Sequence, residues 1–518
     1  MIISAVQRLA RKRSSEALEC DSGGGGIVPI SSGRSQPWRK VGPVTIADAF
    51  DIFNRVLGDL RESDDGKSVR RLCCHLQGGI ALHTEFSGID VPGQVIHGMA
   101  QALLSAGKIS KVDVAYMSAC DKSKGCRSIM QCFPLTMKPT HIGADLLDKI
   151  PQEVRKEILQ IAEHARDLPV DMENLTGHYV ISEIMKALDR CGRPSDLQQS
   201  CDVHGDQGPC KILQRPGGLD DRRLRLLIAG ITCTDYSSAG ARRGLLGDSL
   251  VPLLVFIWAR REGIDDVVLI EEVPAFRKVI MPLLDQFLAD IYQVESVFLC
   301  PSDIGWPMTR RRCFLRLARR DRVEVSSSFS QHSLRAAFSR TVELRGDDLF
   351  MAPQEHLEKL KWRRSGKRAR PSRSSDNNAD DVWSFLSEGE KARLIDQMLP
   401  RQVTVGKSTN DSECTIVNVF NTGKRGSPVR LIPSLTQRTS RIVSLRHMRP
   451  LCGLEHLSAM GIAVWPSCMR TNPIANVFEG RSEAELKSFA GNTMNVNVMC
   501  AVVAFALGGV ALRPYLLE

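Results

Sequence analysis

The chain has 518 residues, of which 43% are hydrophobic and 25% charged, and its formal net charge is +10. This content of apolar residues excludes a disordered chain and allows a sizeable core with about two domains. No apolar run reaches the roughly 20 residues that a membrane-spanning helix needs, so we expect no membrane partner. The 16 cysteines are scattered and follow no apolar signal segment, which favours a reducing compartment over a disulfide framework.

The N-terminal segment, residues 1–66, shows no sustained hydrophobic period. It contains the glycine run Gly23–Gly26 and the arginine- and serine-rich stretch Ser31–Arg39. Such composition is typical of chain that does not pack into a core. We therefore predict a disordered basic tail over residues 1–66.

Residues 67–323 alternate between apolar strands and helices. The predicted strands are Ala81–Glu85, Val112–Met117, Leu224–Gly230, Asp266–Ile270 and Val294–Cys300. The predicted helices between them are Gln94–Ser105, Asp248–Glu262 and Phe276–Ile291. This alternation predicts an α/β fold with a doubly wound, largely parallel sheet.

Polar side chains follow the ends of three of these strands. Cys233 follows the strand 224–230, Glu271 ends the next strand, and an arginine-rich segment, 305–312, follows the strand after that. Open α/β sheets bind ligands outside the carboxyl ends of their strands, so we expect a thiol, a carboxyl group and guanidinium groups at one pocket. A thiolate is a strong nucleophile once its pKa is lowered. The alternative for any one cysteine is a small core residue.

The order of these segments resembles that of the DNA (cytosine-5) methyltransferases. Their nucleophile loop reads Pro-Cys-Gln-x-Phe-Ser-x-Ala-Gly, and this chain keeps Cys233, Ser237, Ala239 and Gly240. Their Glu-Asn-Val segment corresponds to Glu271 and Val273, and their Gln-x-Arg-x-Arg segment to Arg310 and Arg312. Three residues depart from the pattern: Thr232 replaces Pro, Glu272 replaces Asn and Met308 replaces Gln. The departures predict weak activity, which Glu272→Asn with Met308→Gln is expected to raise.

The resemblance implies a Rossmann-like, S-adenosylmethionine-dependent methyltransferase fold and a role for each catalytic residue. Cys233 would attack C6 of a cytosine flipped out of DNA, and Glu271 would assist at N3. Arg312 would contact the base near O2, and Arg310 would support the site. The plainer alternatives are that Glu271 caps the following helix and that Arg312 contacts a phosphate.

The methyl donor site is also implied by the resemblance. Phe86, Ser87, Gly88 and Ile89 match the first motif, which packs S-adenosylmethionine against the end of the first strand. Asp145 matches the acid that reads the adenine amino group, and Asp121 stands where a ribose-binding glutamate is expected. Asn492 lies in a match to the tenth motif. A glycine turn after a strand is by itself a weak signal.

Cys191, Cys201, His204 and Cys210 form the one stretch that is rich in metal-ligand residue types. Their spacing fits no Cys-x-x-Cys knuckle. We therefore expect no metal.

The remainder of the chain is divided into two parts. Residues 324–445 are predicted to be a small target recognition domain, which carries a basic run between Lys359 and Arg373. Residues 446–518 are predicted to return to the catalytic domain with matches to the ninth and tenth motifs, at Arg449 to Gly461 and from Gly491 into the helix Val496–Leu507. The basic run is a solvated loop, a phosphate-contacting segment or a nuclear import signal.

The sequence therefore predicts a cytosine-5 methyltransferase acting on DNA, located in the nucleus of a eukaryote or otherwise inside the cell. Protein partners are not indicated. Two alternatives stay open: an RNA cytosine-5 methyltransferase, and a catalytically weak relative that binds nucleic acid without turnover.

Overall fold

The computed structural model describes residues 39–513, with gaps at 167–172, 195–197, 206–208, 211–221, 232–233, 237–242, 263, 366–414, 420–428, 437–440, 448, 466–467 and 469–473. The side chains of residues 166, 173–176 and 361–365 are also outside the described part. Residues Lys40–Glu518 form one compact unit.

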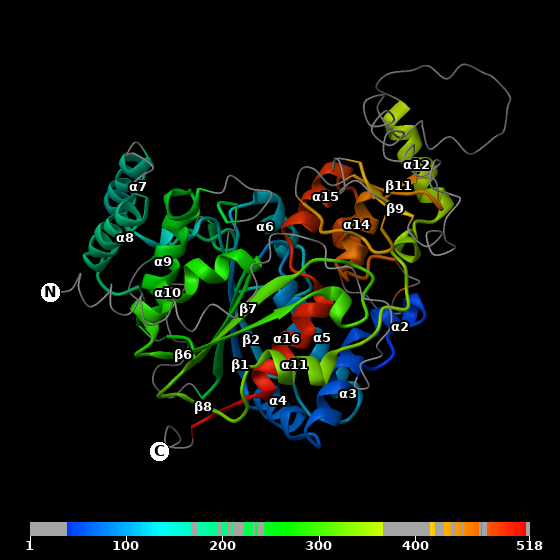
Figure 1. Ribbon diagram of the computed structural model, residues 1–518, viewed down its shortest axis with the longest axis horizontal. Helices are drawn as coiled ribbons and strands as arrows, with labels where there is room; N and C mark the ends of the chain where they lie inside the picture. Colours follow the sequence, from blue (N-terminus) through cyan, green and yellow to red (C-terminus); the bar gives the residue numbers. More distant parts are fainter. Residues whose placement is uncertain are drawn as a thin grey trace. The chain divides into compact units, whose positions relative to one another are not determined.

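A seven-stranded sheet with strand order β3-β2-β1-β4-β5-β7-β6 lies at the centre of this unit (Figure 1). Its strands are β1 (Ile80–Glu85), β2 (Val114–Cys120), β3 (His141–Gly143), β4 (Leu224–Ala229), β5 (Val267–Glu272), β6 (Tyr292–Leu299) and β7 (Arg312–Arg319). Neighbouring strands are parallel, except that β7 is antiparallel to both β5 and β6. The expected α/β fold with a doubly wound, largely parallel sheet is confirmed.

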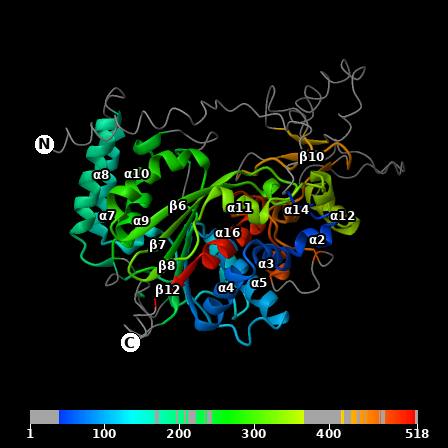
Figure 2. The same ribbon diagram turned by 60° about the horizontal axis from the view of Figure 1, so that its bottom comes forward.

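Helices cover both faces of the sheet, which explains why β1 and β4 consist entirely of buried residues. On one face lie α3 (Ile52–Ser63), α4 (Lys67–Gly78), α5 (Val91–Ser105), α11 (Gln331–Phe338) and α16 (Val496–Gly508) (Figure 2). On the other lie α7 (Gln152–Arg166), α8 (Glu173–Asp189), α9 (Leu250–Arg260) and α10 (Arg277–Leu288). Alternate residues of β4 supply the two cores: Leu226 and Ile228 face the first set of helices, and Leu227 and Ala229 the second.

A small antiparallel sheet lies in the C-terminal part, with order β11-β10-β9. Its strands are β9 (Ile416–Asn418), β10 (Ile442–Ser444) and β11 (Arg449–Pro450), and the helices α14 (Gly453–Ala459) and α15 (Glu483–Asn492) follow it. Arg449 holds the fully buried Glu455 through two hydrogen bonds of 2.6 and 2.7 Å. Such a bidentate pair orders the segment that joins the small sheet to α14.

The prediction of a disordered tail over residues 1–66 is wrong from Lys40 onward. Two helices, α2 (Ile46–Phe50) and α3, occupy this stretch, and α3 packs against α16, α5 and α11. Helix α3 buries Ile52, Val56 and Leu60, one residue in every turn. This apolar stripe stabilises the helix through tertiary packing, which the polar flanking sequence obscured. The first 38 residues of the predicted tail lie outside the described residues.

The predicted boundary at 323/324 also falls too early. Strand β8 (Val323–Val325) pairs with β12 (Val510–Leu512) near the C-terminus, and α11 packs on β6. Both elements therefore belong to the catalytic part. At the other end of the predicted recognition domain, β11 lies beyond residue 445 yet completes the small sheet.

The stretch Glu483–Gly508 is long and apolar enough to pass the composition test for a membrane span, with a mean hydropathy of 1.4. In the structure it comprises two helices, α15 and α16, and 89% of the tested window is buried inside the protein. Helix α16 is covered by α3, α4 and α5, and α15 packs against α14.

Candidate active site

The carboxyl ends of β1, β4 and β5 meet at one edge of the sheet, and Gly230 lies where they converge. A Cβ atom built on Gly230 would lie 3.4 Å from the carbonyl oxygen of Phe86 and 3.8 Å from Oε2 of Glu271. These are ordinary contact distances, whereas the same Cβ atom would lie only 2.8 Å from Cε of Met494, so a side chain at Gly230 would displace Met494. Cys233 is three residues beyond Gly230. It lies outside the described residues, as do Thr232, Ser237, Ala239 and Gly240.

Glu271 and Arg312 form an ion pair at this edge. Arg312 Nε lies 3.0 Å from Glu271 Oε1, and the two side chains are 15% and 12% exposed. Because β7 is antiparallel to β5, the start of β7 lies beside the end of β5. Nη1 of Arg312 donates to the carbonyl oxygen of Arg311 at 3.0 Å, so within the described part of the chain Glu271 Oε2 and Arg312 Nη2 are the polar atoms of this pair without a hydrogen bond.

Arg310 is close in sequence to Arg312 but has a different environment. Its side chain is buried and donates hydrogen bonds to the carbonyl oxygens of Leu435 (2.9 Å) and Thr493 (3.2 Å). It thereby ties the segment before β7 to the chain that joins α15 to α16. This position agrees with a supporting role and excludes direct contact with a base in this conformation.

Glu272, which stands where the resembling family has an asparagine, points to the opposite face of β5 from Glu271. It is 1% exposed, its Oε2 accepts the backbone N–H of Val273 at 3.0 Å, and its Oε1 has no hydrogen-bond partner among the described residues. Burial, and then the charge of Glu271, raise the pKa of Glu272 well above its ordinary value. Burial therefore favours the protonated, neutral form of Glu272 over the carboxylate.

Met308, the third departure, is fully buried in the core. Its sulfur lies 4.0 Å from Nδ2 of Asn495. Because Met308 is covered by protein, a glutamine at this position would lie in the core, and this placement gives no support to the expectation that Met308→Gln raises activity.

The loop after β1 has an unusual backbone. Phe86, Gly88 and Asp90 have φ values of 53°, 57° and 56°, all in the left-handed region. Only glycine adopts this conformation without strain, so the loop is held by its surroundings. A Cβ atom at Gly88 would lie 3.1 Å from the carbonyl oxygen of Asn492, which places the predicted first and tenth motifs in contact.

Asp121 supports this loop from the end of β2. Its Oδ2 accepts the backbone N–H of Gly88 at 2.7 Å, and its Oδ1 accepts that of Ser123 at 2.8 Å. Burial raises the pKa of Asp121, and the two backbone N–H groups oppose the increase. The carboxylate is therefore largely engaged in shaping the loop.

Asp145 follows β3 at the same edge. Its Oδ1 accepts the backbone N–H of Leu147 at 3.1 Å and so caps the short helix η1 (Leu146–Lys149). Its Oδ2 lies 3.4 Å from Nζ of Lys122 and 3.6 Å from Nη2 of Arg155. Lys122 is 86% exposed and Asp145 16% exposed, so the pair with Lys122 is a weak contact at the surface.

Sequence reasoning missed a buried ion cluster that lies beneath the loop after β1. Glu85 accepts hydrogen bonds from Lys149 and from Arg260, the latter at 3.3 Å, and Arg260 also pairs with Asp265 at 3.3 Å. Burial opposes ionisation of Glu85, but Arg260 and Lys149 lower its pKa below the ordinary value. No motif marks these residues, because Lys149 and Arg260 are 64 and 175 residues from Glu85.

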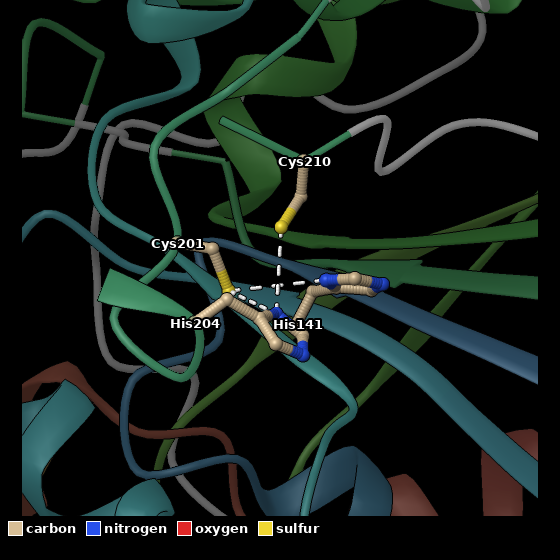
Figure 3. Close-up of side chains that lie close together, drawn as sticks. All are labelled: His141, Cys201, His204 and Cys210. Carbon is tan, nitrogen blue, oxygen red and sulfur yellow. Dashed lines mark hydrogen bonds between the residues drawn. The ribbon is translucent and has the colours of Figure 1, made fainter. Parts of the chain in front are cut away.

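Three residues of the stretch rich in metal-ligand types, Cys201, His204 and Cys210, form a cluster with His141, which the sequence did not reveal (Figure 3). Their ligand atoms all lie within 4.8 Å of one another. Burial raises the pKa of the Cys201 thiol, but hydrogen bonds from His141 and from nearby backbone N–H groups lower the pKa to about 6. Cys191 is not part of the cluster; its thiol contacts the carbonyl oxygen of Ala187 at 3.9 Å.

No protein-family model and no curated protein matches the sequence. Among solved structures, the chain is similar to the Dnmt2 methyltransferase of S. pombe, with 12% identity and a TM-score of 0.37 over 82% of this chain and 98% of the other. It is also similar to a putative DNA modification methyltransferase encoded in an E. coli prophage, with 11% identity and a TM-score of 0.40 over 82% and 98%. The Entamoeba histolytica methyltransferase EhMeth is 10% identical, with a TM-score of 0.35 over 83% of this chain and 98% of the other. The chain's own strand order is that of a doubly wound α/β fold with a central, mostly parallel sheet.

Proposed function

We propose that this protein transfers a methyl group from S-adenosylmethionine to C5 of cytosine in DNA. The observation that carries the proposal is the ion pair of Glu271 with Arg312 beside Gly230, three residues before Cys233. These residues belong to three segments that are similar, in type and order, to the three catalytic motifs of cytosine-5 methyltransferases. Their meeting at the carboxyl edge of the sheet supports a common site.

In the proposed reaction, the Cys233 thiolate forms a bond to C6 of the flipped base, and negative charge develops on the ring. Glu271, as the acid, shares a proton with N3 and so stabilises that charge. Arg312 holds Glu271 through Nε and the carbonyl oxygen of Arg311 through Nη1, and it would offer Nη2 to O2. After the methyl group has bonded to C5, a base removes the C5 proton, and the electron pair of that C–H bond expels the thiolate from C6.

The methyl donor would lie along the ends of β1 to β3. The edge fits an adenosyl group because the strained loop from Phe86 to Ile89 lies at the point where strand order reverses, between β1 and β4. Asp145 would bind the adenine amino group. Asn492, whose carbonyl oxygen lies against Gly88, would border the loop after β1. Asp121 would act mainly by holding Gly88, with little left for a ribose hydroxyl. S-adenosylmethionine supplies the methyl group when bound.

The nucleic acid partner is the open part of the proposal. DNA is the first choice, and RNA is the alternative because the same chemistry serves both polymers. The net charge of +10 suits either polyanion. A nuclear location stays a prediction that rests on the basic run near Arg363.

The test measures transfer of labelled methyl from S-adenosylmethionine to duplex DNA and to transfer RNA, side by side, with the modified nucleoside identified by mass spectrometry. The expected product is 5-methyldeoxycytidine, from the parent and from the control Cys132→Ser, which changes an exposed cysteine remote in sequence from the motifs. Label in 5-methylcytidine alone would assign the enzyme to RNA. Absence of label from both polymers would identify a relative that binds without turnover.

A further inference from the structure

Two thiols and two imidazoles converge at the edge of the sheet, as Figure 3 shows. Nδ1 of His204 lies 3.4 Å from the sulfur of Cys201 and 3.4 Å from that of Cys210. Nδ1 of His141 lies 3.8 Å from the sulfur of Cys201. Because all four ligand atoms also lie within 4.8 Å of one another, the four side chains surround one point.

These spacings are those of a tetrahedral zinc site. Zinc bonds of about 2.3 Å to sulfur and about 2.05 Å to nitrogen, in a tetrahedron, place sulfur and nitrogen about 3.6 Å apart. The three measured separations lie close to this value. Two thiolates with two imidazoles are also the ligand set that selects zinc over magnesium or calcium, which prefer oxygen.

We propose that His141, Cys201, His204 and Cys210 bind one zinc ion. All four ligands come from the protein, so the site is closed and its role is structural rather than catalytic. The proposal does not depend on the proposed methyl transfer.

The described part of residues 198–210 forms a segment that we call the strap. The zinc ion would attach this strap to the edge of the sheet. His141 begins the edge strand β3, whereas the other three ligands lie on the strap. The strap already contacts β3: the backbone N–H of Asp202 donates to the carbonyl oxygen of Ile142 at 2.8 Å. Within the strap, Gln199 and Cys210 form an isolated antiparallel β-bridge.

The strap in turn reaches the proposed donor site. Nε2 of Gln199 donates to the carbonyl oxygen of Asp145 at 3.0 Å, and a Cβ atom on Gly143 would lie 2.6 Å from that nitrogen. On the other side, Arg127 pairs with Asp202 at 2.6 Å. The zinc ion would thus fix the end of β3 and the position of Asp145.

The experiment measures the metal content of the purified full-length protein by mass spectrometry, together with the absorption spectrum after replacement by cobalt. We expect one zinc ion per chain, and cobalt spectra with the bands of a tetrahedral site and of thiolate ligation. His141→Ala and Cys201→Ser should weaken zinc binding by more than about 100-fold, since even changes to residues that only orient a ligand cost roughly 10- to 100-fold. Cys191→Ser, a nearby thiol outside the cluster, should retain the zinc.

A readout on the parent protein covers the case in which the ligand variants fail to fold. Removal of zinc by a chelator should increase amide hydrogen exchange in the strap and in β3, while α16 stays protected. A parent that contains no zinc even after reconstitution would overturn the proposal. So would a disulfide between Cys201 and Cys210 in protein kept under reducing conditions, or equal zinc loss in Cys191→Ser and Cys201→Ser.

Discussion

Arg312 Nε lies 3.0 Å from Glu271 Oε1, and the two residues reach this contact from adjacent antiparallel strands. Glu271 is directly opposite Phe314 in the register, so Arg312, two residues earlier in β7, projects from the same face of the sheet. A rigid backbone pairing therefore sets the relative position of acid and guanidinium. The same pairing sends Glu272 to the opposite face, into the core.

Replacement of Arg312 by alanine should decrease the rate of methyl transfer. Loss of one charge-assisted hydrogen bond at a reacting group costs about 3 kcal/mol, which corresponds to a rate decrease of about 100-fold. The matched control is Arg311→Ala, because Arg311 is the exposed neighbour and packs over Phe298. Equal rates for the two variants would remove Arg312 from the site.

The change Cys233→Ala should abolish transfer while leaving nucleic acid affinity nearly intact, because a thiol forms the bond to C6 but adds little to phosphate contacts. The parent should also form a covalent complex with DNA that contains 5-fluorocytosine, and the variant should not. Residual turnover within about tenfold of the parent, a barrier change of only about 1.4 kcal/mol, would show that another group is the nucleophile.

Glu272 should make the protein less stable as pH rises. Because its folded-state pKa lies well above the ordinary value, the folded state binds a proton that the unfolded state has released. Stability therefore decreases from the unfolded pKa upward, with a slope of at most about 1.4 kcal/mol per pH unit. Glu272→Gln should flatten this slope in urea unfolding measured at pH 5 and pH 8. An unchanged slope would mean that Glu272 is ionised in the folded protein.

Changing Met308 to glutamine should destabilise the protein rather than restore activity. The side chain is fully buried beside Asn495, and an amide left partly unsatisfied there costs about 1 to 3 kcal/mol. The control Met308→Leu keeps the site apolar and should cost less than about 1.5 kcal/mol. A glutamine variant that melts at the parent temperature and turns over faster would contradict this account.

The basic run is expected to contact phosphates. Neutralising Arg363, Arg364, Lys367 and Arg368 together should weaken DNA binding and flatten its dependence on salt, since each lost contact lowers the slope by about one unit. The side chains of these residues lie outside the described part of the structure. Binding with an unchanged salt slope would assign the run to a tail or an import signal.

Local sequence was sufficient to predict the strands whose ends carry the candidate site residues. The mostly apolar runs that end at Glu85, Gly230 and Glu271 predicted β1, β4 and β5 to within about two residues, because strands covered on both faces are rich in apolar residues, although β1 and β4 also bury His83 and Arg225. The order of motifs then placed Glu271 and Arg312 at one edge of the sheet. That edge follows from the topology alone, since parallel strands share their carboxyl ends.

Tertiary structure decided which side chains meet across the chain. His141 is 60 residues from Cys201, so spacing within the strap could not reveal the fourth metal ligand, and the expectation of no metal rested on an incomplete set. Asp121 has the residue type that a ribose site needs, but its oxygens are used by Gly88 and Ser123. Sequence determined the strands, the motifs and their order, because these depend on local hydrophobic pattern. Hydrogen-bond partners, burial and ligand sets depend on packing between distant segments, and only the folded structure determines them.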